Sequence, residues 1–284
     1  MNRTAFKSEE GKALIRGFCE KTIRNWPVKH ERLNVSANGY KTHIMVSGPA
    51  DGEAVILLHG TGTNSASWMG DVPGLSEEFR VYAVDIPGEP GLSDERRLSM
   101  AEGDPPGWLE GLFESLGLEK AHLIGMSLGG CFSLMFGAAH PEKVSSITLL
   151  APSGLSAARL SFLFKALPLM FLGDWGLKRI TKMVSPGVEL PEEMLEFGRL
   201  TAKHFIPVTE PIPILTDTYM ERLQMPILYF GGLKDALLKT KEAAERLKER
   251  CPQAEVNVLK DSGHTIIGKT REIRGFLNAR SKET

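Results

Sequence analysis

The stretch Ala121–Gly130 constrains the fold more than any other part of the sequence. A short apolar run ends there in the motif Gly125-x-Ser127-x-Gly129, and an apolar, helix-compatible segment follows at once. This order predicts a buried strand that stops at a sharp turn, with a serine at the apex and a helix beginning behind it. Glycines suit such a turn because neighbouring backbone passes too close to tolerate a side chain. The motif is short enough to arise by chance, so its meaning depends on the rest of the chain.

Apolar runs alternate with helix-compatible segments along most of the chain. The runs have the continuous apolar character of strands buried on both faces, and they cover 54–58, 81–84, 122–124, 146–150, 227–230 and 255–259. Helix-compatible segments between or after them include 108–116, 128–139, 240–250 and 270–279. This alternation predicts a mostly parallel sheet with helices on both faces. Two further runs, Arg32–Val35 and Tyr40–Val46, flank Asn38-Gly39 and predict a hairpin that adds an antiparallel edge.

The long segment 152–216 interrupts this alternation. It contains no strand-like run, and prolines recur along it. Its first part, 160–172, is the most apolar run in the protein, but it is too short to span a membrane and is interrupted by Lys165 and Pro168. We expect this run either to pack between helices or to act as a lid whose apolar face closes a pocket.

The interruption predicts how the chain is divided. We expect residues 1–151 and 217–284 to form one α/β core, and residues 152–216 to form a helical lid or cap inserted into it. Residues 1 to about 27 are predicted to be a helical extension of the core. Ser8 suits the N-cap of that helix, and the acidic residues after it suit the first turn.

Composition excludes several classes of protein. Of the 284 residues, 42% are hydrophobic and 24% are charged, as in an ordinary globular protein, and the net charge of -1 gives no overall attraction to nucleic acid or to an anionic membrane. We therefore expect no nucleic-acid partner and no stable membrane insertion. Three widely spaced cysteines indicate free thiols, and the polar N-terminus lacks the apolar region of a secretory signal, so the expected location is the cytoplasm.

Chemically useful residues follow several of the apolar runs, where each predicted strand ends. They are His59 to Gly62 after 54–58, Asp85 to Ser93 after 81–84, Asp235 after 227–230, and His264 after 255–259. Ligands bind at the carboxyl ends of the strands in parallel sheets, so we expect these residues to gather with Ser127 at one edge of the sheet. The glycine-rich turn after 54–58 can aim backbone N–H groups into such a site, as an oxyanion hole requires.

These motifs resemble those of the α/β-hydrolase fold superfamily over nearly the whole chain. The matching motifs are His59-Gly60-x-Gly62, Gly125-x-Ser127-x-Gly129, Gly232-x-x-Asp235 and Gly263-His264, with Ser, Asp and His in the order that the superfamily uses. Trp26-Pro27, Ser47-Gly48-Pro49 and the sequence Gly-Met-Ser-Leu-Gly-Gly at the elbow further resemble bacterial carboxylesterases of the Bacillus type. One departure is an extra residue in the loop 88–93. The resemblance implies a mostly parallel, eight-stranded sheet with helices on both faces and an inserted helical lid.

The resemblance also implies a role for each motif residue. Ser127 would be the nucleophile, His264 the general base and Asp235 the acid that orients the base. The backbone N–H groups of Thr61 and Leu128 would form the oxyanion hole. Each side chain has a structural alternative, because Ser127 could be only a small turn residue, His264 a loop histidine, and Asp235 a helix cap. The histidines and cysteines do not cluster, so we expect no metal and no cofactor.

The substrate side of the site is less defined by the sequence. Residues that could line an acyl pocket, or instead belong to the core, are Trp68, Phe162, Phe164, Met170 and Phe171. The expected activity is that of a serine hydrolase that cleaves carboxylic esters of small, largely apolar substrates through an acyl-enzyme. Alternatives on the same triad are a lactonase, a thioesterase and a C–C bond hydrolase, and outside the enzymes a non-catalytic protein that binds a small ligand. The choice between monomer and homodimer stays open.

Overall fold

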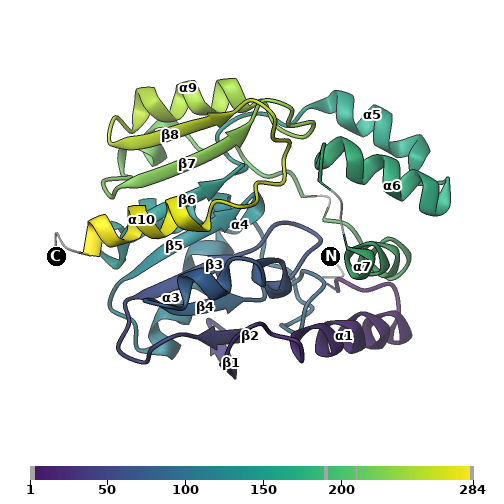
Figure 1. The fold of residues 1–284 in the computed structure, drawn as a ribbon, viewed down its shortest axis with the longest axis horizontal. Coiled ribbons are helices and arrows are strands. Elements are labelled where there is room, and N and C mark those ends of the chain that lie inside the picture. The colour runs from purple at the N-terminus through teal and green to yellow at the C-terminus, as the bar shows by residue number, and fades with distance from the viewer. Residues whose placement is uncertain (1–3, 189–190, 209, 282–284) are drawn as a thin grey trace.

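The computed structural model describes residues 4–188, 191–208 and 210–281. Within them, eight strands form one sheet in the order β1-β2-β4-β3-β5-β6-β7-β8 (Figure 1). The strands are β1 (His30–Ala37), β2 (Tyr40–Ser47), β3 (Ala54–Leu58), β4 (Arg80–Val84), β5 (Ala121–Met126), β6 (Val144–Leu150), β7 (Ile227–Gly232) and β8 (Ala254–Leu259). From β4 to β8 all neighbours in the sheet are parallel. This arrangement confirms the predicted fold class.

The predicted hairpin forms the antiparallel edge of the sheet. Strands β1 and β2 pair from Ala37 opposite Tyr40 to His30 opposite Ser47. Asn38 and Gly39 make the two-residue turn, and both have a positive φ, of 46° and 77°. Such a turn matches the right-handed twist of the flanking strands, which explains why asparagine and glycine occupy it. Strand β2 then pairs antiparallel with β4 and joins the hairpin to the parallel part of the sheet.

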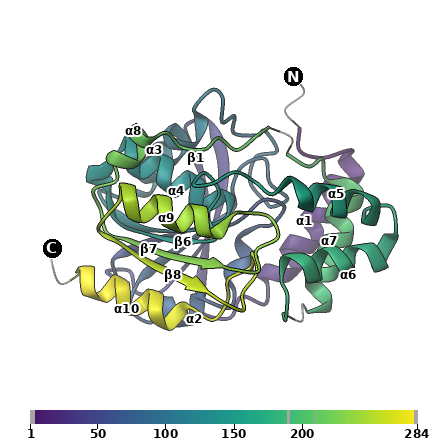
Figure 2. The same ribbon diagram turned by 90° about the horizontal axis from the view of Figure 1, so that it is seen from above.

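Helices cover both faces of the sheet (Figure 2). One face packs against α3 (Asp104–Leu116), α4 (Leu128–Ala139), α8 (Asp217–Glu221) and α9 (Thr240–Arg250). The other packs against a 3-10 turn (Ser65–Trp68), α2 (Val72–Leu75) and α10 (Thr270–Ser281). Strand β3 shows how one strand serves both layers. Its Ile56 and Leu58 belong to the first cluster, whereas Val55 and Leu57 belong to the second, because successive side chains of a strand point to opposite faces.

Strand β8 departs from the predicted burial. The apolar run 255–259 predicts a strand buried on both faces, but Ala254–Leu259 are all half-buried or exposed. The strand lies at the edge of the sheet and pairs only with β7 among the described strands. Its Val258 is 39% exposed. An apolar run alone does not distinguish an edge strand from a central one.

Three elements follow β6 outside the sheet layers: α5 (Leu160–Leu169), α6 (Gly173–Val184) and α7 (Glu192–His204), which we call the cap helices. They lie beyond the carboxyl ends of the parallel strands (Figures 1 and 2). They fall within 152–216, where no strand was expected. The predicted ranges also include residues 1–3, 189–190, 209 and 282–284, which lie outside the described residues. Among the described helices, none is both long and apolar enough to cross a bilayer.

The N-terminal helix α1 (Glu9–Ile23) supports the cap helices. Ser8 caps it, accepting the Gly11 N–H at 3.0 Å, as the sequence predicts. A Cβ atom on Gly11 would lie 2.7 Å from the Cβ of His204, so the helix approaches the end of α7 too closely for a side chain there. The Phe18 and Phe197 rings pack with centroids 5.5 Å apart. The sequence indicated the helix but not its partner.

The contact between α1 and the cap is expected to depend on Ile15. This side chain is fully buried in a cluster with Phe6, Cys19 and Phe205. Ile15→Ala should lower the free energy of unfolding by about 2–5 kcal/mol, because it removes buried methylene groups and leaves a cavity. The adjacent Leu14 is 46% exposed, and Leu14→Ala should change stability by less than about 0.5 kcal/mol. Urea denaturation of both variants measures the difference, and equal effects would contradict the assigned packing.

Candidate active site

The turn between β5 and α4 holds Ser127 in a strained conformation. Its φ and ψ are 48° and −107°, a region that residues with side chains rarely occupy. The Ser127 N–H donates to the Leu150 carbonyl at 3.0 Å, and the Ser127 carbonyl accepts from Cys131 at 3.1 Å. A Cβ atom on Gly125 would lie 2.4 Å from the Gly129 carbonyl oxygen, and one on Gly129 would lie 2.1 Å from the Leu58 carbonyl oxygen. The geometry therefore requires both glycines of the motif.

The structure brings Ser127, His264 and Asp235 together. The His264 Nε2 atom lies 3.0 Å from the Ser127 Oγ atom, and its Nδ1 atom lies 2.8 Å from an Asp235 carboxylate oxygen. The other Asp235 oxygen accepts the N–H groups of Leu237 and Leu238 at 2.7 and 2.9 Å. His264 and Asp235 are buried, 8% and 4% exposed. This arrangement leaves Nε2 free to accept the Ser127 proton when Nδ1 donates to Asp235.

Close backbone contacts fix the loop that carries His264. A Cβ atom on Gly232 would lie 2.1 Å from the Gly263 carbonyl oxygen, so the loops after β7 and β8 touch. On the other side, the His264 N–H donates to the Val184 carbonyl at 2.9 Å. Val184 is the last residue of α6. The end of a cap helix therefore holds the backbone of the residue that faces Ser127.

The glycine-rich loop after β3 lies beside the serine. A Cβ atom on Gly60 would be only 3.4 Å from the Ser127 Cβ atom, and the Gly129 N–H donates to the His59 carbonyl at 3.1 Å. Helix α4 begins at Leu128, and the first N–H groups of a helix have no partner within it. These positions suit the oxyanion hole expected from the N–H groups of Thr61 and Leu128, and that assignment stays a prediction.

His59 links this loop to the loop after β4. Its side chain is fully buried, and its Nε2 atom accepts the Ile86 N–H at 2.9 Å. Its Nδ1 atom must then carry the proton, which it shares with the Gly60 carbonyl at 2.9 Å. Burial lowers the pKa of the His59 imidazole, although Asp85 opposes the shift. His59 is therefore neutral and joins the two loops by hydrogen bonds. It does not contact the reacting atoms directly.

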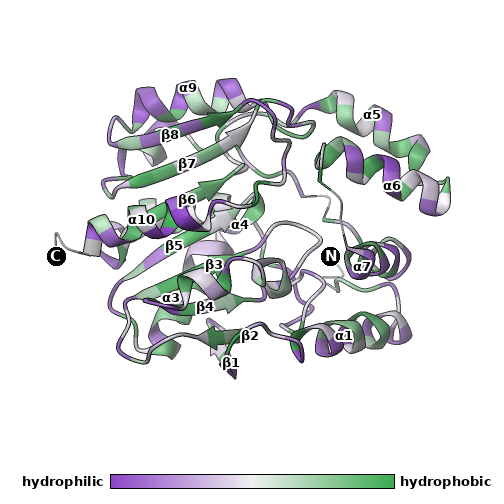
Figure 3. Cartoon of the chain, viewed as in Figure 1, coloured by the Kyte–Doolittle hydropathy of each residue, from purple (hydrophilic) through white to green (hydrophobic). Residues whose placement is uncertain are grey.

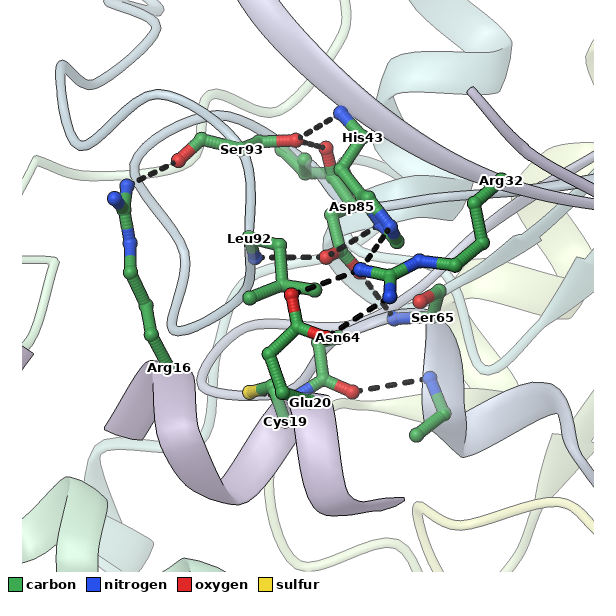
Figure 4. Close-up of polar contacts among 12 residues, drawn as sticks. Arg16, Cys19, Glu20, Arg32, His43, Asn64, Ser65, Asp85, Leu92 and Ser93 are labelled. Carbon is green, nitrogen blue, oxygen red and sulfur yellow. Dashed lines mark hydrogen bonds and ion pairs between the residues drawn. The ribbon is translucent and has the colours of Figure 1, made fainter. Parts of the chain in front are cut away.

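Asp85 organises a buried polar network behind the same loops (Figure 4). It accepts the N–H groups of Ser65 and Leu92, each at 2.8 Å. Its carboxylate lies 3.4 Å from the His43 Nδ1 atom, and Arg32 reaches the far side of that ring at 3.5 Å. Burial alone would raise the pKa of the Asp85 carboxyl, but the nearby His43 and His59 rings and the Leu92 N–H outweigh it and hold this pKa well below its usual range. The charged Asp85 thus ties the 3-10 turn that follows the glycine-rich loop to the segment 86–93.

Glu89 lies within the expected stretch Asp85 to Ser93, but its role as a buried carboxyl beside the glycine-rich loop was not predicted. It is 4% exposed, and one carboxyl oxygen lies 2.6 Å from the Gly62 nitrogen, whose N–H it accepts. Burial raises the pKa of the Glu89 carboxyl to about 7, although the Gly62 N–H and the Arg97 guanidinium both favour the charged form. The sequence shows only that Glu89 lies in the loop after the run 81–84, and this does not predict its contact with Gly62.

The residues proposed for an acyl pocket differ widely in burial. Trp68 is fully buried and packs with Val55 and Leu57 under the sheet, which matches the core alternative. Among the five residues proposed for the pocket, the most exposed are Phe164, Met170 and Phe171, at 77%, 61% and 84%. These three side chains are largely exposed, and their assignment to the pocket stays a prediction. Phe162 is half-buried on α5, and its assignment to the pocket stays a prediction.

Across residues 4–188, 191–208 and 210–281, no three His, Cys, Asp or Glu side chains are grouped so that they could hold a metal ion. Cys19, Cys131 and Cys251 are buried free thiols.

Comparison with known proteins agrees with the fold. A model of the α/β-hydrolase fold family matches residues 53–171. Carboxylesterase YbfK of Bacillus subtilis (strain 168) is 30% identical over 268 residues, which cover 87% of this chain and 86% of that protein. The chain belongs to the α/β-hydrolase fold family.

Two further comparisons extend over most of the chain. The uncharacterized carboxylesterase nap of Bacillus subtilis (strain 168) is 28% identical over 85% of this chain and 83% of its own length. The crystal structure of naproxen esterase (carboxylesterase NP) from Bacillus subtilis superposes with a TM-score of 0.82 at 26% identity, and covers 98% of this chain and 99% of that one. The chain is thus related to carboxylesterases over most of its length.

The buried Glu89 carboxyl should make stability depend on pH. Its pKa lies near 7 in the folded protein, above the ordinary 4.5. The protonated side chain therefore contributes stability that is fully present below pH 4.5 and lost as the pH rises through about 7. Glu89→Gln keeps an oxygen for the Gly62 N–H and removes this proton. Between pH 4.5 and 8, the free energy of unfolding of the wild type should fall by on the order of 3 kcal/mol relative to that of Glu89→Gln.

Urea denaturation of both proteins at pH 5 and pH 8 measures this loss. The matched control is Glu245→Gln, which removes an exposed carboxyl on α9. This control should follow the wild type at both pH values. Parallel pH dependence of the wild type and Glu89→Gln would contradict the assigned burial of a protonated Glu89.

Proposed function

We propose that the protein is a serine hydrolase that cleaves carboxylic esters. The observation that carries this proposal is the His264 ring, which lies 3.0 Å from the Ser127 hydroxyl and 2.8 Å from the Asp235 carboxylate. A neutral imidazole held between a hydroxyl and a carboxylate can take the hydroxyl proton as the oxygen attacks. The relation to carboxylesterases supports the choice of an ester as substrate.

The first half of the reaction forms an acyl-enzyme. The Ser127 Oγ atom attacks the ester carbonyl carbon while His264 Nε2 takes its proton. Asp235 accepts the Nδ1–H bond throughout, which fixes the tautomer and stabilises the imidazolium. The carbonyl oxygen becomes an oxyanion, which the N–H groups of Thr61 and Leu128 stabilise. Each such donor contributes on the order of 3 kcal/mol to the transition state. The C–O bond to the alcohol then breaks as His264 protonates the departing oxygen.

The second half releases the acid. Water enters the place that the alcohol left, and His264 takes one of its protons as its oxygen attacks the acyl carbon. The tetrahedral intermediate collapses, the bond to Ser127 breaks, and His264 returns the proton to the Ser127 oxygen. The products are a carboxylic acid and an alcohol, and the enzyme regains its starting state. None of these steps requires a group beyond the protein and water.

The substrates are expected to be small and largely apolar esters. Residues 152–216 are assigned to a lid inserted into the core formed by 1–151 and 217–284. The contact between Val184 and the His264 backbone supports this division, because it places the end of α6 beside the site. A lid in that position would select substrates by the size of the acyl and alcohol groups that fit between it and Ser127.

Ser127→Ala should abolish ester hydrolysis while the fold persists. Removal of the nucleophile of such a triad lowers kcat by at least about 10³-fold, and hydrolysis of p-nitrophenyl butyrate measures the loss. The matched control is Ser115→Ala, which removes an exposed hydroxyl on α3 and should retain full activity. Circular dichroism checks that both variants fold. Full activity in Ser127→Ala would overturn the proposed function.

Labelling separates an enzyme from a protein of this fold that only binds a ligand. A fluorophosphonate should attach to Ser127 in the wild type and leave Ser127→Ala unlabelled, because the reagent needs an activated serine. A panel of p-nitrophenyl esters graded by acyl length, with lactones, thioesters and a β-diketone included, then ranks the alternative reactions by kcat/KM. An unlabelled wild type would favour a binding role, and a lactone, thioester or diketone preferred over every ester would replace the proposed substrate class.

A further inference from the structure

The turn between α5 and α6 exposes an unusual number of large apolar side chains. Within this segment, which we call the cap tip (residues 170–175), Met170, Phe171, Leu172 and Trp175 are 61%, 84%, 52% and 59% exposed. Large apolar side chains gathered on a surface mark a site of interaction, because their exposure to water is unfavourable. Proposed ester hydrolysis at Ser127 does not account for them.

Helix α5 continues this apolar surface toward the core. Leu160, Phe164 and Leu167 are 67%, 77% and 60% exposed, and Phe171 follows at the same spacing. Residues separated by three or four positions lie on one side of a helix, so these side chains form a stripe that ends at the cap tip. Figure 3 shows the hydrophobic colour along α5. The solvent-facing side of this helix is therefore apolar, which is the reverse of an ordinary surface helix.

Basic side chains border the apolar surface. Lys165 on α5 and Lys178, Arg179 and Lys182 on α6 are exposed. The Arg179 guanidinium lies over the Trp175 ring, 5.8 Å from its centre. Residues 159–182 contain five basic residues and one acidic residue, Asp174, and Asp174 is paired with Arg199 at 3.1 Å. The net charge of -1 for the whole chain conceals this local excess of positive charge.

The cap tip stands clear of the rest of the protein. In two views at right angles, the α5–α6 turn lies at the end of the molecule opposite the C-terminus (Figures 1 and 2). A flat surface could therefore meet the tip without meeting the sheet or α9. Aromatic and aliphatic side chains at a projecting turn, with lysine and arginine around them, match the requirements for binding in the interface of an anionic bilayer.

We propose that the cap tip and the exposed side of α5 form a peripheral binding site for an anionic phospholipid surface. The apolar side chains enter the boundary between head groups and acyl chains, and the basic side chains contact the anionic head groups. A second copy of the chain is a poorer occupant, because a symmetric contact between two tips would bring the two basic clusters together. A nucleic acid would satisfy the charges but leave the apolar side chains exposed to water.

The fluorescence of Trp175 can report this contact directly. The other three tryptophans, all within the described residues, are buried: Trp26 is 6% exposed, and Trp68 and Trp108 are 0% exposed. Vesicles of phosphatidylcholine with 30% phosphatidylglycerol should shift the fluorescence of Trp175 to shorter wavelength, and brominated phosphatidylcholine in those vesicles should quench it. Binding to vesicles of phosphatidylcholine alone should be at least about 10-fold weaker and should not depend on salt. No shift with the anionic vesicles would overturn the proposal.

Matched variants test which residues make the contact. Phe171→Ser with Leu172→Ser keeps Trp175 as the probe and should weaken vesicle binding by at least about 10-fold, whereas the control Leu14→Ser on the exposed side of α1 should not. Lys178→Glu with Arg179→Glu should do the same, whereas the control Lys241→Glu with Lys248→Glu on α9 should bind like the wild type. The assignment would be overturned if the Phe171→Ser, Leu172→Ser variant and the Lys178→Glu, Arg179→Glu variant both bound vesicles like the wild type.

Two further measurements separate the other occupants and the proposed function. Sedimentation equilibrium without lipid should give the same mass for the wild type and the Phe171→Ser, Leu172→Ser variant. A dimer that this variant dissociates would replace the lipid surface by a second copy of the chain. Ser127→Ala should bind vesicles as the wild type does, since the cap tip does not include the site. In Ser127→Ala, loss of hydrolysis together with retained vesicle binding would therefore support both proposals. A wild type that hydrolyses esters but does not bind anionic vesicles would overturn this proposal alone.

Discussion

The close packing of the start of α4 against the end of β3 is the constraint on which the rest of the site depends. Gly129 lies so near the Leu58 carbonyl that a Cβ atom would be 2.1 Å from its oxygen. This contact forces the chain to turn within one residue, and Ser127 takes a φ of 48° as a result. A serine in an ordinary helical or extended conformation would not leave the sheet edge at this angle. The strain at Ser127 is thus supported by two glycines and by the buried layers on either side.

The strained turn is useful only because the loops around it are held equally firmly. Asp85 and His59 are buried polar groups that accept backbone N–H groups. Asp85 accepts from the 3-10 turn that follows the glycine-rich loop, and His59, which lies in that loop, accepts from the segment after β4. Buried polar groups are costly unless their hydrogen bonds are made. The same cost therefore opposes any displacement of the glycine-rich loop. Glu89 adds a further acceptor beneath Gly62, so the loop beside Ser127 is fixed from below by side chains of the segment after β4.

The sheet and the candidate triad could be predicted from the sequence because both depend on local patterns. The predicted ranges 54–58 and 128–139 match β3 and α4 at both ends. Residues that follow parallel strands necessarily meet at one edge of the sheet. The role of Glu89 could not be predicted, because its contact with Gly62 joins two loops far apart in the chain. The same holds for Phe18 and Phe197, which pack across 179 positions. Long-range contacts of this kind leave no periodic signal.

The cap helices show why an apolar run does not always mean burial. The sequence 160–172 was expected to pack between helices or to close over a pocket, yet Phe164 and Phe171 are 77% and 84% exposed. A strand or helix in the core has neighbours on both sides, whereas α5 and α6 have the rest of the cap on one side only. α6 buries Gly176, and the buried apolar residue of α5 among those described is Ala166. Because these are small residues, the two helices approach closely, whereas Leu160, Phe164 and Leu167 of α5 remain exposed. Selection for a soluble surface alone would place charges at those positions, and their apolar character is therefore better explained by a surface that the cap contacts outside the chain.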